Sequence, residues 1–251
     1  MATFNATFNA TFNATFNATS TALTMTRLLA INTASTPCSV ALSLDGMCHF
    51  RKSKAERQAA QQVLPLIQEL LDASGVSLSG LDAVAVVTGP GSFTGMRIGV
   101  GVAQGLALAN ELPIIPLSAL AVIAKEAAMQ APASEYWLVA MPARAPEIYL
   151  GAYRCAPGEE VTALHKEWIG EPQELAAAVA TLGIREWGAA GTAWTKRLGE
   201  LLGVEPVTCQ SELLGAIDAV CELARERWRE ERYVPAEQAL PNYIKEEMDY
   251  S

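Results

Sequence analysis

One continuous stretch, residues 81–109, constrains the fold most. It begins with the β-branched apolar run "LDAVAVVTG", passes through the glycine-rich loop "GPGSFTG" and continues as "MRIGVGVAQGLALA". An apolar run without alternation is typical of a strand buried on both faces of a sheet. The stretch therefore predicts a buried strand that turns directly into a helix rich in small residues.

The residues on either side supply more strands and helices. Before the stretch, "LLAINTA", "CSVALSLD" and "MCHFRKS" predict three antiparallel strands, with a hairpin at Asp45-Gly46. A helix follows, with Pro65 in its first turn or at a kink and Gly75 at its end. After the stretch, "LPIIPLS" predicts a strand and "ALAVIAKEAAMQA" a helix. The predicted order is β-β-β-α-β-α-β-α.

The second half predicts a shorter version of the same order. "APASE" (131–135) is a plausible linker, and "YWLVAMPARAPEIYLGAYR" predicts two strands. A third strand is expected near "VTALHKEWI", and helices are expected at 172–182 and 212–229. We therefore expect an N-terminal lobe at 25–131 and a reduced copy of it at 132–251.

The first residues repeat "ATFN" four times (2–17), without charges or helix caps. We expect residues 1–24 to be a disordered extension and the folded chain to begin at Met25. A variable-length tail or an adhesive strand is the alternative.

Charge and composition exclude several classes of protein. The chain carries 27 acidic and 18 basic residues, a formal net charge of −9, which disfavours unaided binding to nucleic acid. The five cysteines form no CxxC pair, which favours reduced thiols over disulfides or zinc. No run reaches the roughly 18 apolar residues of a membrane span. We expect a cytoplasmic protein without a membrane association.

The glycine-rich loop has two interpretations. Gly89, Gly91, Ser92 and Gly95 would form a weak phosphate loop at a helix N-terminus. However, the Walker pattern needs Lys and Ser or Thr after its last glycine, where this chain has Met and Arg, and the GxGxxG spacing is one residue too long. The favoured interpretation is a tight strand-to-helix turn without a bound cofactor, and ATP would bind only weakly or at a partner interface.

The helix after the loop carries Gly101, Gly105 and Ala109 at intervals of four residues. Each glycine costs a helix about 1 kcal/mol relative to alanine, so this face needs a compensating close contact. The contact lies either within the domain or with a partner subunit.

The chain offers little catalytic material. Its two histidines, His49 and His165, are far apart, so no metal pair or histidine-based triad is expected. "AINTAS" is similar to the first phosphate loop of actin-like ATPases, but Asn32 stands where an aspartate would help to hold magnesium. A polar cluster, Arg144, Glu147 and Tyr149, is expected at a strand turn, where it either binds a ligand or caps a hairpin.

In order along the chain, "LLAINTASTPCSVALSLDG", "VLPLIQELL", "GPGSFTGMRIGVGVAQGLALANELPIIPLSAL", "ARAPEIYLGAY", "GTAW" and "LPNYIKE" resemble the bacterial TsaB (YeaZ) family. The resemblance implies an α/β, actin-like ATPase (ASKHA) fold with two related lobes, each a mixed sheet flanked by helices. It also implies a non-catalytic partner of the transferase TsaD, which with the ATPase TsaE makes N6-threonylcarbamoyladenosine at position 37 of tRNAs that read codons beginning with A.

The same resemblance implies that TsaD pairs with the first two helices and that tRNA is bound only through the complex. Without TsaD this helical face would be an exposed apolar patch, so we also expect the chain to form a homodimer alone. The interface residues that it implies are Val63, Leu64, Ile67, Leu71, Met96, Gly101, Gly105 and Ala109.

The chain departs from the family pattern at Asn32, Ala59, Pro142 and Lys245, where relatives usually have Asp, often His, Asp and Arg. Each departure removes or changes a polar group. Two alternatives stay open: an ATP-dependent transferase or kinase of the actin-like fold, which Asn32 disfavours, and a peptidase, for which the histidines are lacking.

Overall fold

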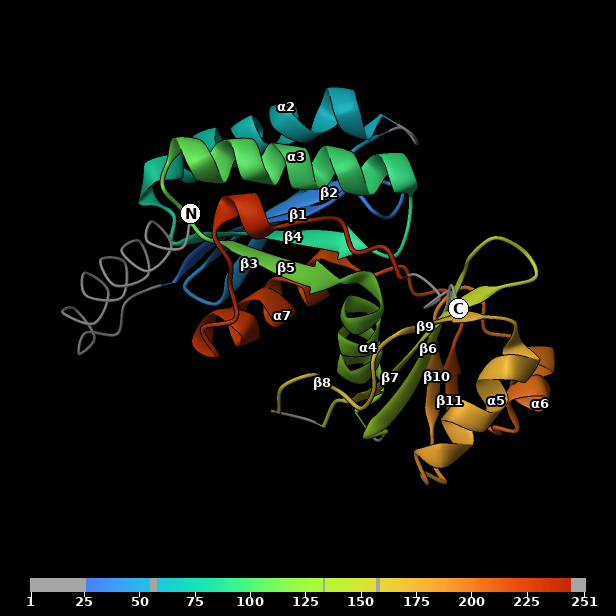
Figure 1. Ribbon diagram of the computed structural model, residues 1–251. Coiled ribbons are helices and arrows are strands. Elements are labelled where there is room, and N and C mark those ends of the chain that lie inside the picture. Colours follow the sequence, from blue (N-terminus) through green and yellow to red (C-terminus); the bar gives the residue numbers. More distant parts are fainter. Residues whose placement is uncertain (1–25, 55–57, 133, 157–158, 245–251) are drawn as a thin grey trace, which may run out of the picture.

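A computed structural model describes residues 26–54, 58–132, 134–156 and 159–244 of the chain, and Figure 1 shows them as two lobes side by side. Each lobe contains one β-sheet. The predicted extension at 1–24 and the departure at Lys245 lie outside the described residues.

The first lobe has a five-stranded sheet in the order β3-β2-β1-β4-β5. β1 and β2 pair antiparallel, as do β2 and β3, whereas β4 runs parallel to both β1 and β5. The strands are β1 (Arg27–Asn32), β2 (Ser39–Leu44), β3 (Met47–Lys52), β4 (Ala83–Gly89) and β5 (Ile114–Ser118). The predicted hairpin at Asp45-Gly46 is confirmed, because both residues have positive φ (53° and 85°), as a tight two-residue turn requires.

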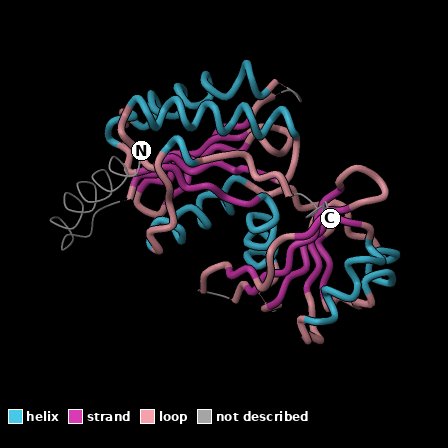
Figure 2. The backbone as a smooth tube through the Cα atoms, viewed as in Figure 1, coloured by secondary structure: helices cyan, strands magenta, loops and turns pink. Residues whose placement is uncertain are grey.

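Helices cover both faces of this sheet, as Figures 1 and 2 show. α2 (Ala59–Ser74) and α3 (Phe93–Ala109) lie on one face, and α4 (Ala119–Gln130) and α7 (Ile217–Arg229) pack on the other. β4 is buried over its whole length, as its apolar run predicts. Pro65 lies within α2 beyond the first turn, and Gly75 ends that helix with a φ of 67°. A short 3-10 turn, η1 (Leu78–Gly80), precedes β4.

The second lobe repeats the topology of the first. β6 pairs antiparallel with β7 and parallel with β10, and β10 pairs parallel with β11. The sheet order β11-β10-β6-β7-β8, with β9 also on β7, is the order of the first sheet read in reverse, and β8, β10 and β11 are shorter than their counterparts. Its elements are β6 (Tyr136–Pro142), β7 (Ile148–Arg154), β8 (Thr162–Ala163), β9 (Trp168–Gly170), α5 (Pro172–Thr181), β10 (Gly188–Ala190), α6 (Lys196–Leu202) and β11 (Thr208–Gln210). The predicted actin-like fold of two related lobes is confirmed.

The sequence analysis misplaced part of the second half. The helix expected at 212–229 begins only at Ile217, because the backbone N–H groups of Gly215 and Ala216 donate to Glu126 Oε2 and Gly215 has a φ of 82°. α7 then packs against the first sheet instead of the second. Residues 217–244 therefore belong with the first lobe, and the predicted second lobe at 132–251 is too long.

The chain after α7 runs back along the first lobe and forms what we call the C-terminal strap, residues 234–244, with the 3-10 turn η2 (Ala236–Gln238) near its start. Val234 pairs with Ile114, and Gln104 Nε2 donates to the carbonyl groups of Ala236 and Ala239. The Asn242 N–H donates to the carbonyl oxygen of Thr88. The strap thereby reaches the loop at the end of β4.

Candidate functional site

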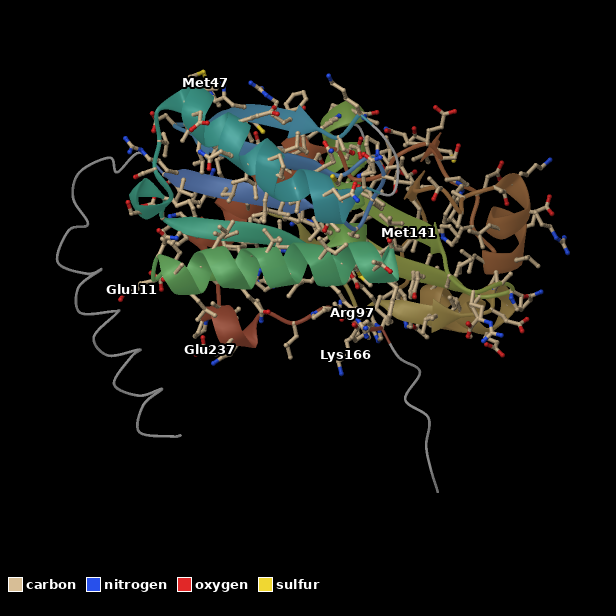
Figure 3. The ribbon with its side chains drawn as sticks, turned by 90° about the horizontal axis from the view of Figure 1, so that it is seen from above. Met47, Arg97, Glu111, Met141, Lys166 and Glu237 are labelled. Carbon is tan, nitrogen blue, oxygen red and sulfur yellow. The ribbon has the colours of Figure 1, made fainter. Side chains whose placement is uncertain are left out.

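The outward side of α3 presents a nearly uncharged surface, whereas the exposed side of the neighbouring α2 also carries Glu69 and Asp72. α3 has no charged residue between Arg97 and Glu111, and Figure 3 shows these two at opposite ends of the helix. We call this surface the α2–α3 face and define it by its exposed small and apolar residues, Leu64, Gly101, Gly105, Leu108 and Ala109. Contiguous exposed apolar surface is where a folded chain associates with a partner, which makes this face the candidate interface.

Half of the predicted interface residues do not reach this face. The structure buries four of them between the helices and the sheet, namely Val63, Ile67, Leu71 and Met96. Their hydrophobic periodicity indicates the side of each helix that packs on the core, which is the side opposite to the solvent. The interface prediction is corrected accordingly: Leu64, Gly101, Gly105 and Ala109 remain at the surface.

The glycines of α3 fall into two pairs with different surroundings. A Cβ on Gly95 or Gly99 would lie 2.0 Å from the Thr33 carbonyl oxygen or 2.2 Å from Thr33 Oγ1. Thr33 Oγ1 also donates to the Gly95 carbonyl oxygen over 2.7 Å. In contrast, a Cβ on Gly101 or Gly105 would meet nothing within 4 Å. Gly95 and Gly99 therefore allow α3 to approach Thr33 closely inside the domain. Gly101 and Gly105 face open space at the surface.

The amide groups of the loop between β4 and α3 already donate hydrogen bonds within the chain. The Ser92 N–H donates to the Ala34 carbonyl oxygen, the Gly95 N–H to Ser92 Oγ and the Met96 N–H to the Ser92 carbonyl oxygen. A phosphate bound here would need such donors to be free. Gly89 has a φ of 126°, and a Cβ on Gly91 would lie 2.6 Å from the Ala34 carbonyl oxygen, so the glycines permit a tight turn.

Asn32 closes the cleft between the two lobes at the end of β1. Its buried side chain donates from Nδ2 to the Gly215 carbonyl oxygen over 3.1 Å and accepts at Oδ1 from the Ala34 N–H. The hollow lined by these residues and Met141 has a volume of about 10 Å³. That volume holds no more than about one water molecule, so a nucleotide does not fit in this arrangement.

The other polar candidates are dispersed. Arg144 and Glu147 form the turn of the β6–β7 hairpin, where the Glu147 N–H donates to the Arg144 carbonyl oxygen, and Tyr149 packs against the core. His49 is exposed on β3, and His165 stacks on Trp168 at 4.6 Å. In the described part of the chain, no three His, Cys, Asp or Glu side chains gather as metal ligands do, and no helix there is long and apolar enough to cross a membrane.

Comparisons with known proteins agree on one family. The model of the family TsaD: tRNA N6-adenosine threonylcarbamoyltransferase matches residues 52–181. The tRNA threonylcarbamoyladenosine biosynthesis protein TsaB of Escherichia coli K12 is 37% identical over 228 residues, which cover 87% of this chain and 94% of that protein. The TsaB of Haemophilus influenzae is 43% identical over 49% of this chain and 51% of its own.

Solved structures give the same result. YeaZ from Pseudomonas aeruginosa has a TM-score of 0.76 and 36% identity, over 88% of this chain and all of that one. A structure described as an uncharacterized protein with similarity to peptidase YEAZ, also from Pseudomonas aeruginosa, has a TM-score of 0.77 and 37% identity over the same shares. Both likenesses extend over the two lobes.

Proposed function

Because this chain belongs to the TsaB (YeaZ) family and takes part in tRNA threonylcarbamoyladenosine biosynthesis, we propose that it is the non-catalytic partner subunit of the transferase TsaD. The observation that carries this proposal is the α2–α3 face. Leu108 is 60% exposed and Leu64 is 51% exposed, and the outward side of α3 holds glycine and alanine. TsaD would pack on this face and remove it from water.

The small residues suit such a contact. Helices whose interface consists of glycine and alanine approach one another closely, because no side chain separates their backbones. The space above Gly101 and Gly105 is free within this chain, so a partner would supply the contact that the sequence predicts for them. In this proposal the α2–α3 face binds TsaD, the ATPase TsaE joins the pair, and tRNA is held through the complex.

Two further features of the chain support a role without catalysis. Asn32 offers a neutral amide where a kinase of this fold would use a carboxylate for magnesium, and its Oδ1 already accepts a hydrogen bond from the Ala34 N–H. The net charge of −9 opposes direct capture of tRNA by this chain. The alternative, an ATP-dependent transferase or kinase, predicts that ATP with magnesium raises the melting temperature of the chain. The scaffold proposal predicts no such rise.

Binding to TsaD is best tested with a matched set of variants. Gly101→Leu and Gly105→Leu add a side chain to the α2–α3 face, and Ala180→Leu adds one to the exposed side of α5 in the other lobe. Light scattering on a sizing column, with TsaD from the same organism, should give a one-to-one complex for the wild type and Ala180→Leu. Separate peaks are expected for the two glycine variants. Equal binding by all four chains would disprove the role of this face.

The same face leads to a prediction for the chain alone. An uncovered apolar surface favours self-association, so we propose a homodimer, in the cytoplasm, whenever TsaD is absent. Sedimentation velocity should show a dimer for the wild type and a shift toward monomer for Gly105→Leu. A wild-type monomer at high protein concentration would contradict this part of the proposal.

A further inference from the structure

Two cysteines of the first lobe lie on elements that pack against each other. Cys48 is on the edge strand β3, and Cys221 is on α7, which packs on the side of the first sheet opposite to α2 and α3 (Figure 1). Both cysteines belong to one hydrophobic cluster, in which Cys221 is fully buried and Cys48 lies half-buried at the margin. Both are free thiols.

Contacts through Ser43 and Arg225 bring these two cysteines together. Ser43 on β2 is the cross-strand partner of Cys48, and residues directly opposite on neighbouring strands point to the same face of a sheet. Arg225 Nη1 on α7 donates to Ser43 Oγ over 2.6 Å, so this face of the sheet is the one turned toward α7. Cys221 and Arg225 are one helical turn apart on the same side of α7. The two thiols are therefore neighbours.

The ionisation of Cys221 reflects this neighbour. The Cys48 thiol, together with burial, raises the pKa of the Cys221 thiol above its ordinary value, and the guanidinium of Arg225 opposes that shift only in part. The thiolate is the form of cysteine that reacts with oxidants. Cys221 is therefore not the first of the pair to react, and an oxidant attacks Cys48, the more exposed of the two thiols.

We propose that Cys48 and Cys221 form a reversible disulfide when the chain meets hydrogen peroxide. The Cys48 thiolate attacks one oxygen of the peroxide, the O–O bond breaks, and the departing hydroxide takes up the thiol proton as water, which leaves a sulfenic acid on Cys48. The Cys221 sulfur then displaces the hydroxyl group from the Cys48 sulfur, and the Cys221 proton leaves with that group as water. Two thiols thus lose two electrons in total, and one peroxide molecule becomes two water molecules.

The surroundings of Cys221 suit this second step. Oxidation of Cys48 removes the thiol that raises the pKa of Cys221, while Arg225 stays beside the Cys221 sulfur and favours its thiolate. The disulfide would fasten the edge strand β3 to α7, and a thiol reductant would open it again. This pair lies on the side of the first sheet opposite to the α2–α3 face, so it does not depend on a protein partner.

Mass spectrometry can locate this disulfide because proteolysis separates the cysteines. Trypsin, together with a protease that cuts before aspartate, places Cys48 in residues 45–51 and Cys221 in residues 218–225, and every other cysteine in a different peptide. The full chain is treated with hydrogen peroxide, blocked with iodoacetamide in denaturant and digested without reduction. The expected product is the first peptide joined to the second, lighter by two hydrogen atoms than both reduced peptides together. Dithiothreitol should abolish it.

A probe for sulfenic acid tests the order of the two steps. Dimedone traps sulfenic acid, so it should label Cys48 only weakly in the wild type, where Cys221 consumes the intermediate. In Cys221→Ala the labelling of Cys48 should rise several-fold. Cys155→Ala removes another buried thiol of the same cluster and should leave both the labelling and the joined peptide unchanged. The melting temperatures of both variants report their folding, and the wild-type measurement requires neither variant.

Two results would overturn the proposal. Absence of the joined peptide from the peroxide-treated wild type, whatever else Cys48 becomes, would mean that Cys221 does not reach the Cys48 sulfur. Equal labelling of Cys48 by dimedone in the wild type and in Cys221→Ala would mean that Cys221 takes no part in the second step. Neither result bears on the pairing with TsaD, because these measurements use the chain alone and that pairing is measured by light scattering.

Discussion

Asn32 Nδ2 donates a hydrogen bond to the carbonyl oxygen of Gly215 over 3.1 Å, across 183 positions of sequence. The bond joins the end of β1 to the segment that leads into α7. Glu126 Oε2 accepts the Gly215 N–H over 2.9 Å and so holds the same segment from α4. The neutral amide at position 32 therefore connects the parts of the chain that meet between the lobes.

Asn32→Asp should destabilise the protein. The substitution replaces a donor with a carboxylate that faces the Gly215 carbonyl oxygen at a site only 2% exposed, although the contact with the Ala34 N–H can persist. We expect the free energy of unfolding to fall by about 2–4 kcal/mol, measured by urea denaturation at pH 7. Asn110→Asp, at a half-buried position where Nδ2 donates to Leu106, is the control and should cost less. Equal losses of stability in the two variants would mean that the buried hydrogen bond to Gly215 contributes no more than the one at Asn110.

Two glycines of α3 should respond in opposite directions to the same substitution. A Cβ on Gly99 would lie 2.2 Å from Thr33 Oγ1, so Gly99→Ala should lower the free energy of unfolding by about 1–3 kcal/mol. A Cβ on Gly101 would meet nothing within 4 Å, so Gly101→Ala should raise it by about 0.5–1 kcal/mol through helix propensity alone. Thermal or urea unfolding of both variants tests this, and the same sign for both would refute it.

Local patterns predicted the elements of the first lobe because each pattern has a local cause. The β-branched run of β4 requires burial on both faces, and Asp45-Gly46 can adopt positive φ. The sequence did not show that α7 packs on the first sheet, because its apolar stripe indicates which side is buried but not against what. Periodicity likewise placed Val63 and Ile67 on the apolar side of a helix. It did not show that this side faces the core instead of a partner.

The hollow of about 490 Å³ at the carboxyl ends of β4 and β5 was missed for a similar reason. Glu167 and Arg232 are separated by 64 intervening residues, and neither lies in a recognisable motif. Only the topology, which brings β7, the segment before β9, α7 and the carboxyl ends of β4 and β5 together, places both residues beside the same hollow. Residues 188–190 and 196–202 were missed because such short elements carry too little periodicity to detect.

The five cysteines should differ sharply in reactivity. Cys38, Cys155 and Cys221 are buried, and burial raises the pKa of the Cys155 thiol to about 11. Cys209 is exposed, although partial burial also raises the pKa of its thiol. Alkylation requires the thiolate, so in the native protein at pH 8 iodoacetamide should label Cys209 well before Cys38, Cys155 or Cys221. Peptide mass spectrometry of timed samples measures the order. Guanidinium-denatured protein, in which all five should react alike, is the control, and early labelling of Cys155 would contradict its burial.

Glu167 should make the protein less stable as the pH rises above the usual carboxyl range. Burial raises the pKa of its carboxyl group in the folded chain, and the hydrogen bonds from Ser118 and Tyr153 offset only part of that shift. In the unfolded chain the group loses its proton near the ordinary value of about 4.3. Between these two values the folded state binds more protons than the unfolded state, so the free energy of unfolding declines with increasing pH.

Glu167→Gln should remove this pH-dependent contribution. Urea denaturation from pH 4 to pH 7 should therefore show the variant gaining stability relative to the wild type as the pH rises. Glu171→Gln serves as the control, because it removes a charge from an exposed position at the start of α5. Its difference in free energy of unfolding from the wild type should not grow with pH in the same way. A constant difference between Glu167→Gln and the wild type over this interval would mean that Glu167 titrates as an ordinary surface carboxyl group.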